Sequence, residues 1–339
     1  MDRDFIRDAF VLVTDYVKAD TGKDVSDELQ ELILNNPRKV LYFPDGEYLL
    51  SKPICTPANP EHAVSLKLSN FAVIKAMDSW DSEEALIRLG AAEPFNTIYV
   101  NGSNYYLSGG IIDGNDRANG VSIDSGRETR VENLSIKHTK IGLHIKYGAN
   151  TGSSDADICN VNIVGRGTVD SIGVLVEGMD NTFTNMRIAR VQIGVKLMKG
   201  GNYLRNIHPL YSLATGFDHY TDSIAFCDLS WENWYDFCYS DQYCTGFYMK
   251  SDVRSIYHNC FVYWWKTLEG GEIGFKAEGK FCSLLTNCKV TFRKDANDTN
   301  FLLVGKAGGY GVIENPFFNE EQAPDKSYMD YLKGKVLHP

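Results

Sequence analysis

A short phrase that begins with glycine recurs seven times between Gly120 and Val290 and constrains the fold more than any other feature. In each copy, residues alternate between mostly apolar and mostly polar side chains, as in GVSI, GLHI and GVKL. Alternation with a period of two indicates strands. The spacing of the copies is that of a solenoid turn, with insertions in some turns. The copies begin at Gly120, Gly142, Gly173, Gly194, Gly216, Gly246 and Gly274.

A second phrase, built around Asn or Asp, follows each glycine before the next copy begins. Its polar centres are Asn133, Asn160, Asn185, Asn206, Asp228, Asn259 and Asn287. Asn is favoured at tight turns, and stacked copies would form an amide ladder. Parallel strands that cannot bury one face alone must stack on copies of themselves. The repeat therefore predicts an all-β protein, a single-domain right-handed parallel β-helix.

The two ends of the chain have different patterns. Asp4 to Lys18 and Asp24 to Asn35 place apolar residues at helical spacing, which predicts N-terminal capping helices. We expect a helical cap over residues 1–36, the β-helix over 37–312, and a C-terminal tail over 313–339 with a short helix around Tyr328 to Leu332.

Composition and charge disfavour several classes of partner unless a cation intervenes. The net charge of −10 disfavours nucleic acid, anionic membranes and polyanionic glycans. The N-terminus lacks the pattern of a signal peptide, and no apolar run reaches the length of about 18 residues that a membrane span needs. No CxxC or Cys/His spacing suggests a metal among the eight cysteines. We expect a soluble, cytoplasmic protein without metal or cofactor.

Two phrases resemble a known superfamily. After the helical stretch the chain reads YFPDGEY and then SKPI within Val40 to Ile54, and GGIIDGNDRANG follows at Gly109 to Gly120. They resemble coils of the pectate-lyase-like β-helix superfamily, which includes polysaccharide lyases, glycoside hydrolases and phage tailspike depolymerases. The GHG and RIK phrases of its polygalacturonases and the Trp-Ile-Asp-His phrase of its pectate lyases are missing here. A weaker likeness is to inulin fructotransferases. The resemblance implies the fold and carbohydrate chemistry.

The predicted binding surface lies in two long insertions. The two longest intervals from a polar centre to the next glycine are Asp228 to Gly246 and Asn259 to Gly274, and they are adjacent. They contain four of the five tryptophans, and aromatic rings among polar groups are typical of a sugar site. The substrate-binding candidates in them are Trp231, Trp234, Tyr235, Gln242, Trp264 and Trp265. Lys196, Tyr248 and His144, on the outward row two positions after the glycines, are added to them.

Four carboxylates are the catalytic candidates, namely Asp218, Glu232, Asp236 and Asp241. Equivalent positions in neighbouring coils lie about 4.8 Å apart. A pair of carboxylates on such a scaffold suits either a retaining or an inverting glycosidase. The polar turns Asp124 to Thr129 and Gly148 to Ile158 are instead interpreted as turn chemistry.

The leading hypothesis is a glycoside hydrolase or transglycosidase that acts on a neutral oligosaccharide with two carboxylates. The first alternative is a lyase that eliminates from a uronate, using Lys196, Arg187, Arg205 or Tyr248. The second is a non-catalytic, glycan-binding or spike-like β-helix. The expected partner is an oligosaccharide, and a homo-oligomer, dimer or trimer, is possible.

Overall fold

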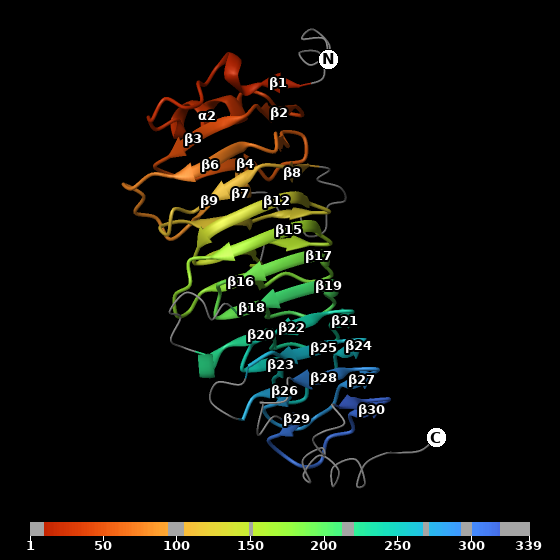
Figure 1. Ribbon diagram of the computed structural model, residues 1–339. Coiled ribbons are helices and arrows are strands. Elements are labelled where there is room, and N and C mark those ends of the chain that lie inside the picture. Colours follow the sequence, from red (N-terminus) through yellow and green to blue (C-terminus); the bar gives the residue numbers. More distant parts are fainter. Residues whose placement is uncertain are drawn as a thin grey trace. The chain divides into compact units, whose positions relative to one another are not determined.

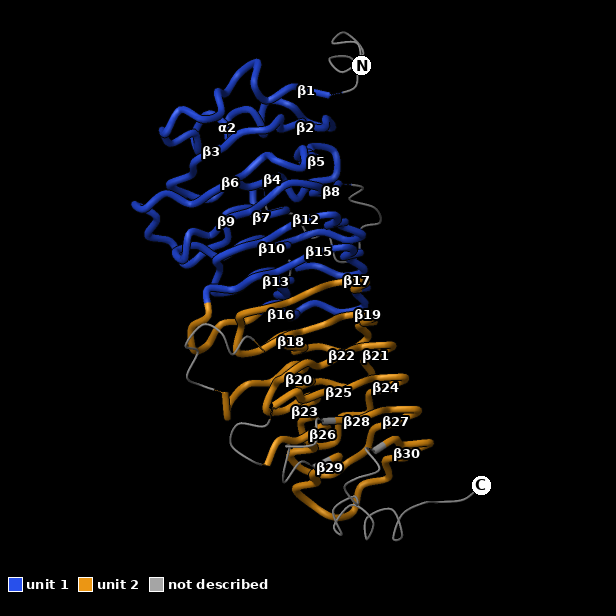
Figure 2. Tube along the Cα trace, in the orientation of Figure 1, with its two compact units in different colours: residues 1–166, 173–182 blue, residues 167–172, 183–339 orange. Residues whose placement is uncertain are grey.

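The computed structural model describes residues 10–93, 105–148, 152–211, 220–266, 271–292 and 300–318. The chain forms two compact units, residues 1–166 with 173–182 and residues 167–172 with 183–339 (Figure 2). Within each unit the strands stack in parallel layers (Figure 1). In the described part of the chain, no helix is long and apolar enough to cross a membrane.

Unit 1 contains two main sheets of parallel strands. The Gly sheet, named after the glycine phrases it carries, contains β4 (Ile54–Pro57), β7 (Ala85–Ala92), β10 (Asn119–Ile123), β13 (Ile141–Ile145) and β16 (Ile172–Val176). The Asn sheet contains β1 (Val11–Leu12), β2 (Val40–Phe43), β3 (Gly46–Leu50), β5 (Ser65–Leu68), β6 (Ala72–Ala76), β8 (Tyr106–Ser108), β9 (Ile111–Asp113), β12 (Arg130–Thr139) and β15 (Asp157–Gly165). A small sheet pairs β11 (Gly126–Arg127) with β14 (Ser153–Ser154).

Unit 2 repeats this architecture. Its Gly sheet contains β18 (Ile193–Leu197), β20 (Ile224–Asp228), β23 (Thr245–Met249), β26 (Ile273–Ala277) and β29 (Asn300–Val304). Its Asn sheet contains β17 (Thr182–Ala189, all but Thr182 in this unit), β19 (Tyr203–Leu210), β21 (Trp234–Asp236), β22 (Tyr239–Asp241), β24 (Ile256–His258), β25 (Phe261–Trp264), β27 (Leu284–Thr286), β28 (Lys289–Phe292), β30 (Val312–Glu314) and β31 (Phe317–Phe318). The short 3-10 helix η3 (Tyr220–Asp222) precedes β20. The parallel β-helix that the repeat predicts is confirmed in both units.

The core of each unit lies between its two sheets, where the predicted inward rows meet. In unit 1, Val121, Leu143 and Ile145 are at most 1% exposed. In unit 2, Phe226, Phe247 and Phe275 stack with ring centroids 4.6 and 4.9 Å apart on successive strands. Burying each such ring contributes roughly 1.5–3 kcal/mol, so the in-register stack holds neighbouring coils together.

The repeated glycines are required by space rather than by backbone conformation. A Cβ on Gly142 would lie 2.5 Å from Cγ2 of Ile163, and one on Gly246 would lie 2.6 Å from Cγ2 of Val262. Both neighbours are inward residues of the Asn sheet. The glycine phrase therefore marks the point where the two sheets approach most closely.

The predicted Asn ladder forms at the corner of the Asn sheet. Asn133, Asn160, Asn185, Asn206, Asn259 and Asn287 all have φ between 52° and 58°, the left-handed region that Asn tolerates. Hydrogen bonds between side-chain amides join the coils. Asn160 Nδ2 donates to Asn133 Oδ1 in unit 1 (3.1 Å), and Asn287 Nδ2 donates to Asn259 Oδ1 in unit 2 (3.3 Å). The amides are solvent-accessible, not buried.

One predicted member of the ladder is wrong. Asp228 ends β20, which pairs with β18 and β23 in the Gly sheet, and its side chain is buried. The corner position in this coil belongs to Phe237, with a φ of 52°. The glycine position is occupied by Ala225, because Phe226 pairs with Val195 and Phe247. The phrase predicted for this strand, at Gly216, lies outside the described residues.

The N-terminal prediction is only partly matched. The stretch Asp24 to Asn35 contains helix α2 (Ser26–Leu34), which buries Leu29 and Ile33. In contrast, residues 10–18 contain β1 and the 3-10 turn η1 (Val13–Asp15), so the predicted first helix is wrong over this part. The reason is the edge of β2, which pairs with β1 and satisfies its backbone groups.

The C-terminal part contains one further difference. β30 and β31 pair with β27 and β28 and continue the coil to Phe318, past the predicted boundary at residue 312. The predicted helix around Tyr328 to Leu332 lies outside the described residues.

Candidate functional site

In their described residues, the two insertions on which the predicted site depends consist partly of strands. The interval from Asp228 to Gly246 contains a turn, β21, the corner at Phe237, and β22. The second interval contains β25. The first interval is long only when it is counted from Asp228, which is not a ladder residue. Much of each interval belongs to the strands of the β-helix.

Three predicted binding residues lie in the core, and these predictions are wrong. Tyr235 is 1% exposed and stacks on Tyr257 at 4.6 Å. Trp264 is fully buried and donates its indole N–H to the carbonyl of Tyr243 at 2.6 Å. Gln242 is fully buried and bonds backbone groups of residues 265 and 266. Alternation directs these side chains inward, where no substrate reaches them.

Asp236 and Asp241, two of the predicted carboxylates in the described part of the chain, are not brought together as a pair. Asp218 lies outside the described residues, and Glu232 is exposed on a turn with a φ of 59°. Asp236 and Asp241 pair with Arg205 and Leu210, which are five positions apart on β19, a span of up to roughly 16 Å. They point outward on either side of a convex corner. At a backbone separation of this order they do not form the predicted carboxylate pair.

The other predicted binding residues are dispersed. Trp231, Trp234 and Trp265 are 61%, 40% and 43% exposed on unit 2. Lys196 and Tyr248 lie on the outward row of its Gly sheet. Burial and a hydrogen bond to Glu278 raise the pKa of Tyr248 to about 12. His144 lies in unit 1, beside the hollow described next.

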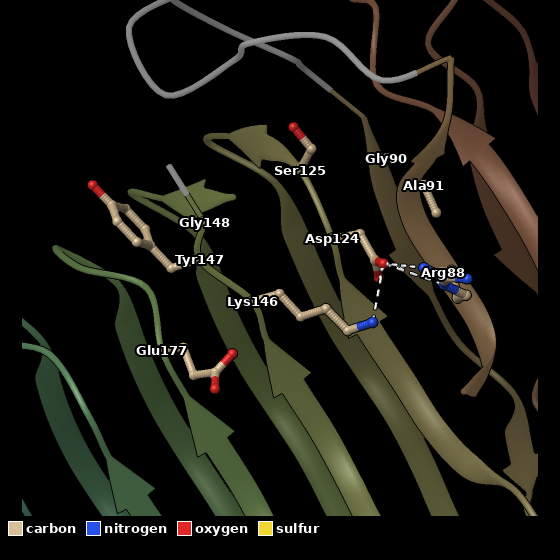
Figure 3. Close-up of a pocket in the computed structure, with 9 residues that line it drawn as sticks. All are labelled: Arg88, Gly90, Ala91, Asp124, Ser125, Lys146, Tyr147, Gly148 and Glu177. Atoms are coloured by element: carbon tan, nitrogen blue, oxygen red, sulfur yellow. Dashed lines mark hydrogen bonds and ion pairs between the residues drawn. The ribbon is translucent and has the colours of Figure 1, made fainter. Parts of the chain in front are cut away.

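A hollow of about 300 Å³ opens on the outer face of the Gly sheet of unit 1 (Figure 3). Its charged residues come from four neighbouring strands, Arg88 on β7 and three residues that directly follow β10, β13 and β16. These three are Asp124, Lys146 and Glu177. The remaining lining residues are Gly90, Ala91, Ser125, Tyr147 and Gly148.

Asp124, Lys146 and Glu177 occupy equivalent positions in successive coils. Their backbone N–H groups bond to the carbonyls of Leu89, Ile123 and Ile145, each one position before the matching residue in the preceding coil. Asp124 and Glu177 are therefore separated by two strand spacings, or roughly 9–10 Å between Cα atoms. Lys146 lies between them.

Asp124 is held as a carboxylate. Its Oδ2 accepts hydrogen bonds from Arg88 Nη2 (2.5 Å) and Nε (3.2 Å) and from Lys146 Nζ (3.1 Å), and Ser122 donates to Oδ1. Burial by itself raises the pKa of Asp124, but the bonds from Arg88 and Ser122 and the charge of Lys146 outweigh it. They hold the pKa below its ordinary value of 3.8.

Glu177 has a different environment. Its side chain is 41% exposed, and Oε2 lies 3.0 Å from Nε2 of His144, a distance at which the two groups can share a proton. Among the described candidates, His144 is thus the predicted site residue that contacts a residue lining the hollow. The site contains one fixed carboxylate and, two coils away, one carboxyl group in contact with an imidazole ring.

Sequence reasoning missed Arg88, Asp124, Lys146 and Glu177, although a signal was present. The last three residues each stand four positions after a repeated glycine, two positions beyond the outward row that includes His144. Side chains two positions apart on a strand point to the same face, so Asp124, Lys146 and Glu177 are expected on the same outer face as that row. The interpretation of Asp124 as turn chemistry is wrong, because its side chain bonds Arg88 and Lys146 across the sheet.

The described residues contain no group of three or more His, Cys, Asp or Glu side chains that could hold a metal ion. All eight cysteines are free thiols.

Comparison with known proteins supports the fold. No protein-family model matches the sequence, and the comparison with curated proteins gave no significant match. Among solved structures, the chain is similar to a double mutant of the tailspike protein of E. coli bacteriophage HK620, with a TM-score of 0.69 and 12% identity. That match covers 94% of this chain and 65% of the tailspike chain, so this chain spans less than two thirds of its length.

The tailspike in complex with a pentasaccharide is also similar, with a TM-score of 0.67, 11% identity, and coverage of 94% and 67%. At such identities the likeness shows the fold alone. Membership of the pectate-lyase-like superfamily stays a prediction.

Proposed function

We propose that this chain is a carbohydrate-active enzyme that cleaves a glycosidic bond of a neutral oligosaccharide in the hollow of unit 1. The observation that carries the proposal is the placement of Asp124 and Glu177 on either side of Lys146 in one hollow. The fold likeness to a tailspike that binds a pentasaccharide supports the class of ligand.

In the proposed mechanism, Glu177 donates a proton to the leaving oxygen. The neighbouring His144 holds the Glu177 carboxyl group in place and returns a proton after each cycle. Asp124 enters the reaction ionised, stabilises the positive charge that develops on the sugar, and accepts a proton from the attacking water, which it then releases to solvent. Among the described residues only Ser122 donates to its Oδ1, which leaves a lone pair for that water.

The spacing favours inversion of configuration. Carboxyl groups about 6.5–9.5 Å apart leave room for a water molecule, whereas a retaining enzyme needs about 5–5.5 Å. Asp124 and Glu177 are two strand spacings apart, or roughly 9–10 Å between Cα atoms, which is nearer to the first arrangement than to the second.

The charges of the hollow favour a neutral substrate over a uronate. Both cations among the nine lining residues are paired, Arg88 with Asp124 and Lys146 with Asp124 and Glu84. Neither is free to neutralise a substrate carboxylate, as β-elimination would require. A lyase is therefore the less favoured enzyme.

The test is turnover of a panel of neutral oligosaccharides and uronans by the wild-type chain and by Glu177→Gln. Loss of a general acid should reduce turnover roughly 10²–10⁴-fold, and Asp124→Asn should have an effect of similar size. Glu132→Gln, on the Asn sheet of the same unit, is the matched control and should retain activity. Reducing ends report hydrolysis, and absorbance of unsaturated products reports elimination.

Three outcomes contradict the proposal. Unsaturated products would favour the lyase, and binding of glycans without turnover would favour a glycan-binding protein. Normal turnover by Glu177→Gln would move the reaction away from this hollow.

A further inference from the structure

A second polar and aromatic cluster lies on unit 2, on the outer face of β19, β21 and β24. Trp234 pairs in register with Tyr203 on one side and Ile256 on the other, and Asp236 pairs with Arg205 and His258. Alternation directs both sets outward. Trp234, Asp236, Tyr203, Arg205 and His258 together are called the β21 patch below.

The polar row of the β21 patch is organised around Asp236. Its Oδ1 lies 3.0 Å from Nδ1 of His258, and its Oδ2 lies 3.7 Å from Nε of Arg205 and accepts a hydrogen bond of 3.4 Å from the Tyr203 hydroxyl. The Asp236 side chain is 19% exposed, whereas those of Arg205 and His258 are 57% and 47% exposed. The carboxylate is thus held in place while the donors beside it reach solvent.

The aromatic row supplies an accessible ring next to these groups. Trp234 is 40% exposed although it is in a strand, and Tyr203 lies opposite it in the preceding coil. A large exposed aromatic side chain that adjoins fixed donors and acceptors is typical of a recognition site.

We propose that the β21 patch binds one sugar residue of a neutral glycan without cleaving it. The apolar face of the sugar packs on Trp234, and its hydroxyl groups bond Asp236, Arg205 and His258. Ring hydroxyls both donate and accept, so they complement a carboxylate flanked by two donors. The proposal relies on the proposed function only for the class of ligand.

The described neighbours indicate binding rather than catalysis. The outward row through Asp236 continues with Thr286 and Glu314 in later coils. Glu314 is three strand spacings from Asp236, or roughly 14 Å, and Asp241 faces away across the corner. Along this row of described residues, Asp236 therefore has no second carboxylate at either glycosidase spacing. A contact between two copies of the chain would require a wider apolar surface than one row beside charged groups.

The experiment measures binding separately from turnover. Malto-, cello-, manno- and chito-oligosaccharides are titrated into the Glu177→Gln chain by calorimetry. The titration is repeated with chains that carry Trp234→Ala or Asp236→Asn as a second substitution. Each added change should weaken one class of binding sites about tenfold or more, the loss expected for an aromatic platform or a charged hydrogen bond. Phe71→Ala, an exposed aromatic on unit 1, should leave that affinity unchanged.

Failure of this inference differs from failure of the proposed function. Binding that depends on Trp234 in a chain without turnover would support the β21 patch and contradict the enzyme. Turnover with unchanged binding in both β21 variants, or no binding of any sugar in the panel, would overturn the inference. So would a Trp234→Ala change that alters only the sedimentation coefficient, because it would identify a contact between copies.

Discussion

At the scale of single residues, the partly buried Asp124 and the buried Asp228 show how neighbouring groups decide the pKa of a carboxyl group. Asp124 is bonded by two cations, and its pKa is lowered. Asp228 is 1% exposed, and burial raises its pKa although neutral donors bond it, among them Ser255 Oγ at 2.6 Å and Asn233 Nδ2 at 3.0 Å. A carboxylate with cations beside it stays ionised. A buried carboxylate that is bonded by neutral donors alone loses more solvation free energy than those hydrogen bonds restore, so its pKa rises.

The ion pairs of Asp124 predict a pH dependence of stability. Because its folded-state pKa lies below 3.8, they stabilise the fold above about pH 4, and this contribution is lost as the pH falls through the lowered pKa. Asp124→Asn should therefore be less stable than wild type at pH 7 and lose less stability on acidification. Urea unfolding at several pH values measures both effects, and parallel curves for the two proteins would contradict the prediction.

Asp228→Asn tests the buried network of unit 2. In the variant, the amide N–H₂ faces at least one group that donates to the carboxylate in the wild type. Two donors cannot bond each other, and a buried unsatisfied group costs about 1–3 kcal/mol. We expect a loss of that size in the free energy of unfolding at pH 7. It should grow toward acid pH, because the raised pKa makes the native Asp228 stabilise the fold more as the pH falls toward 3.8. Asp222→Asn on η3 is an exposed control.

At the scale of elements, the Asn ladder stabilises the corner between two strands of each coil. Asn287 donates to Asn259 Oδ1 and accepts from Asn315 Nδ2, both at 3.3 Å, with a φ of 54°. The amides are accessible to water, so their hydrogen bonds contribute little beyond those that water offers. The backbone conformation therefore accounts for most of the preference for Asn.

Two substitutions at Asn287 separate these contributions. Asn287→Ala should cost about 1–2 kcal/mol, because alanine resists the left-handed region, and Asn287→Gly should cost less. Urea unfolding measures the difference. Equal losses in the two variants would show that the hydrogen bonds of the Asn287 side chain, and not the backbone conformation, account for most of its contribution.

At the scale of the whole molecule, the net charge of −10 affects which glycans bind. Binding of a neutral oligosaccharide should change little with ionic strength. A polyuronate, in contrast, should be repelled at about 0.01 M salt, where charges interact over about 30 Å, and less so at about 1 M, where the screening length is about 3 Å. Calorimetry at the two salt concentrations checks this, and tight polyuronate binding at low salt would contradict it.

The coil itself could be predicted from the sequence, because its signals are local. Alternation in GLHI and GVKL places Leu143 and Val195 inward, and Asn at a left-handed corner is favoured by its own side chain. The site was largely missed because which outward residues meet depends on strand register. Asp124, Lys146 and Glu177 belong to three different coils and align only when these coils stack.

The amino-acid sequence alone thus determined the parallel β-helix, since most turns between Gly120 and Val290 repeat one pattern of residue size and polarity. The tertiary structure decided which coil each phrase belongs to, as Asp228 and Phe237 show, and which aromatic rings are buried. Trp234 and Trp264 have the same chemistry, but one faces solvent and the other the core. The reason is that a shift of one residue in a strand exchanges the two faces, and contacts between neighbouring coils fix that choice.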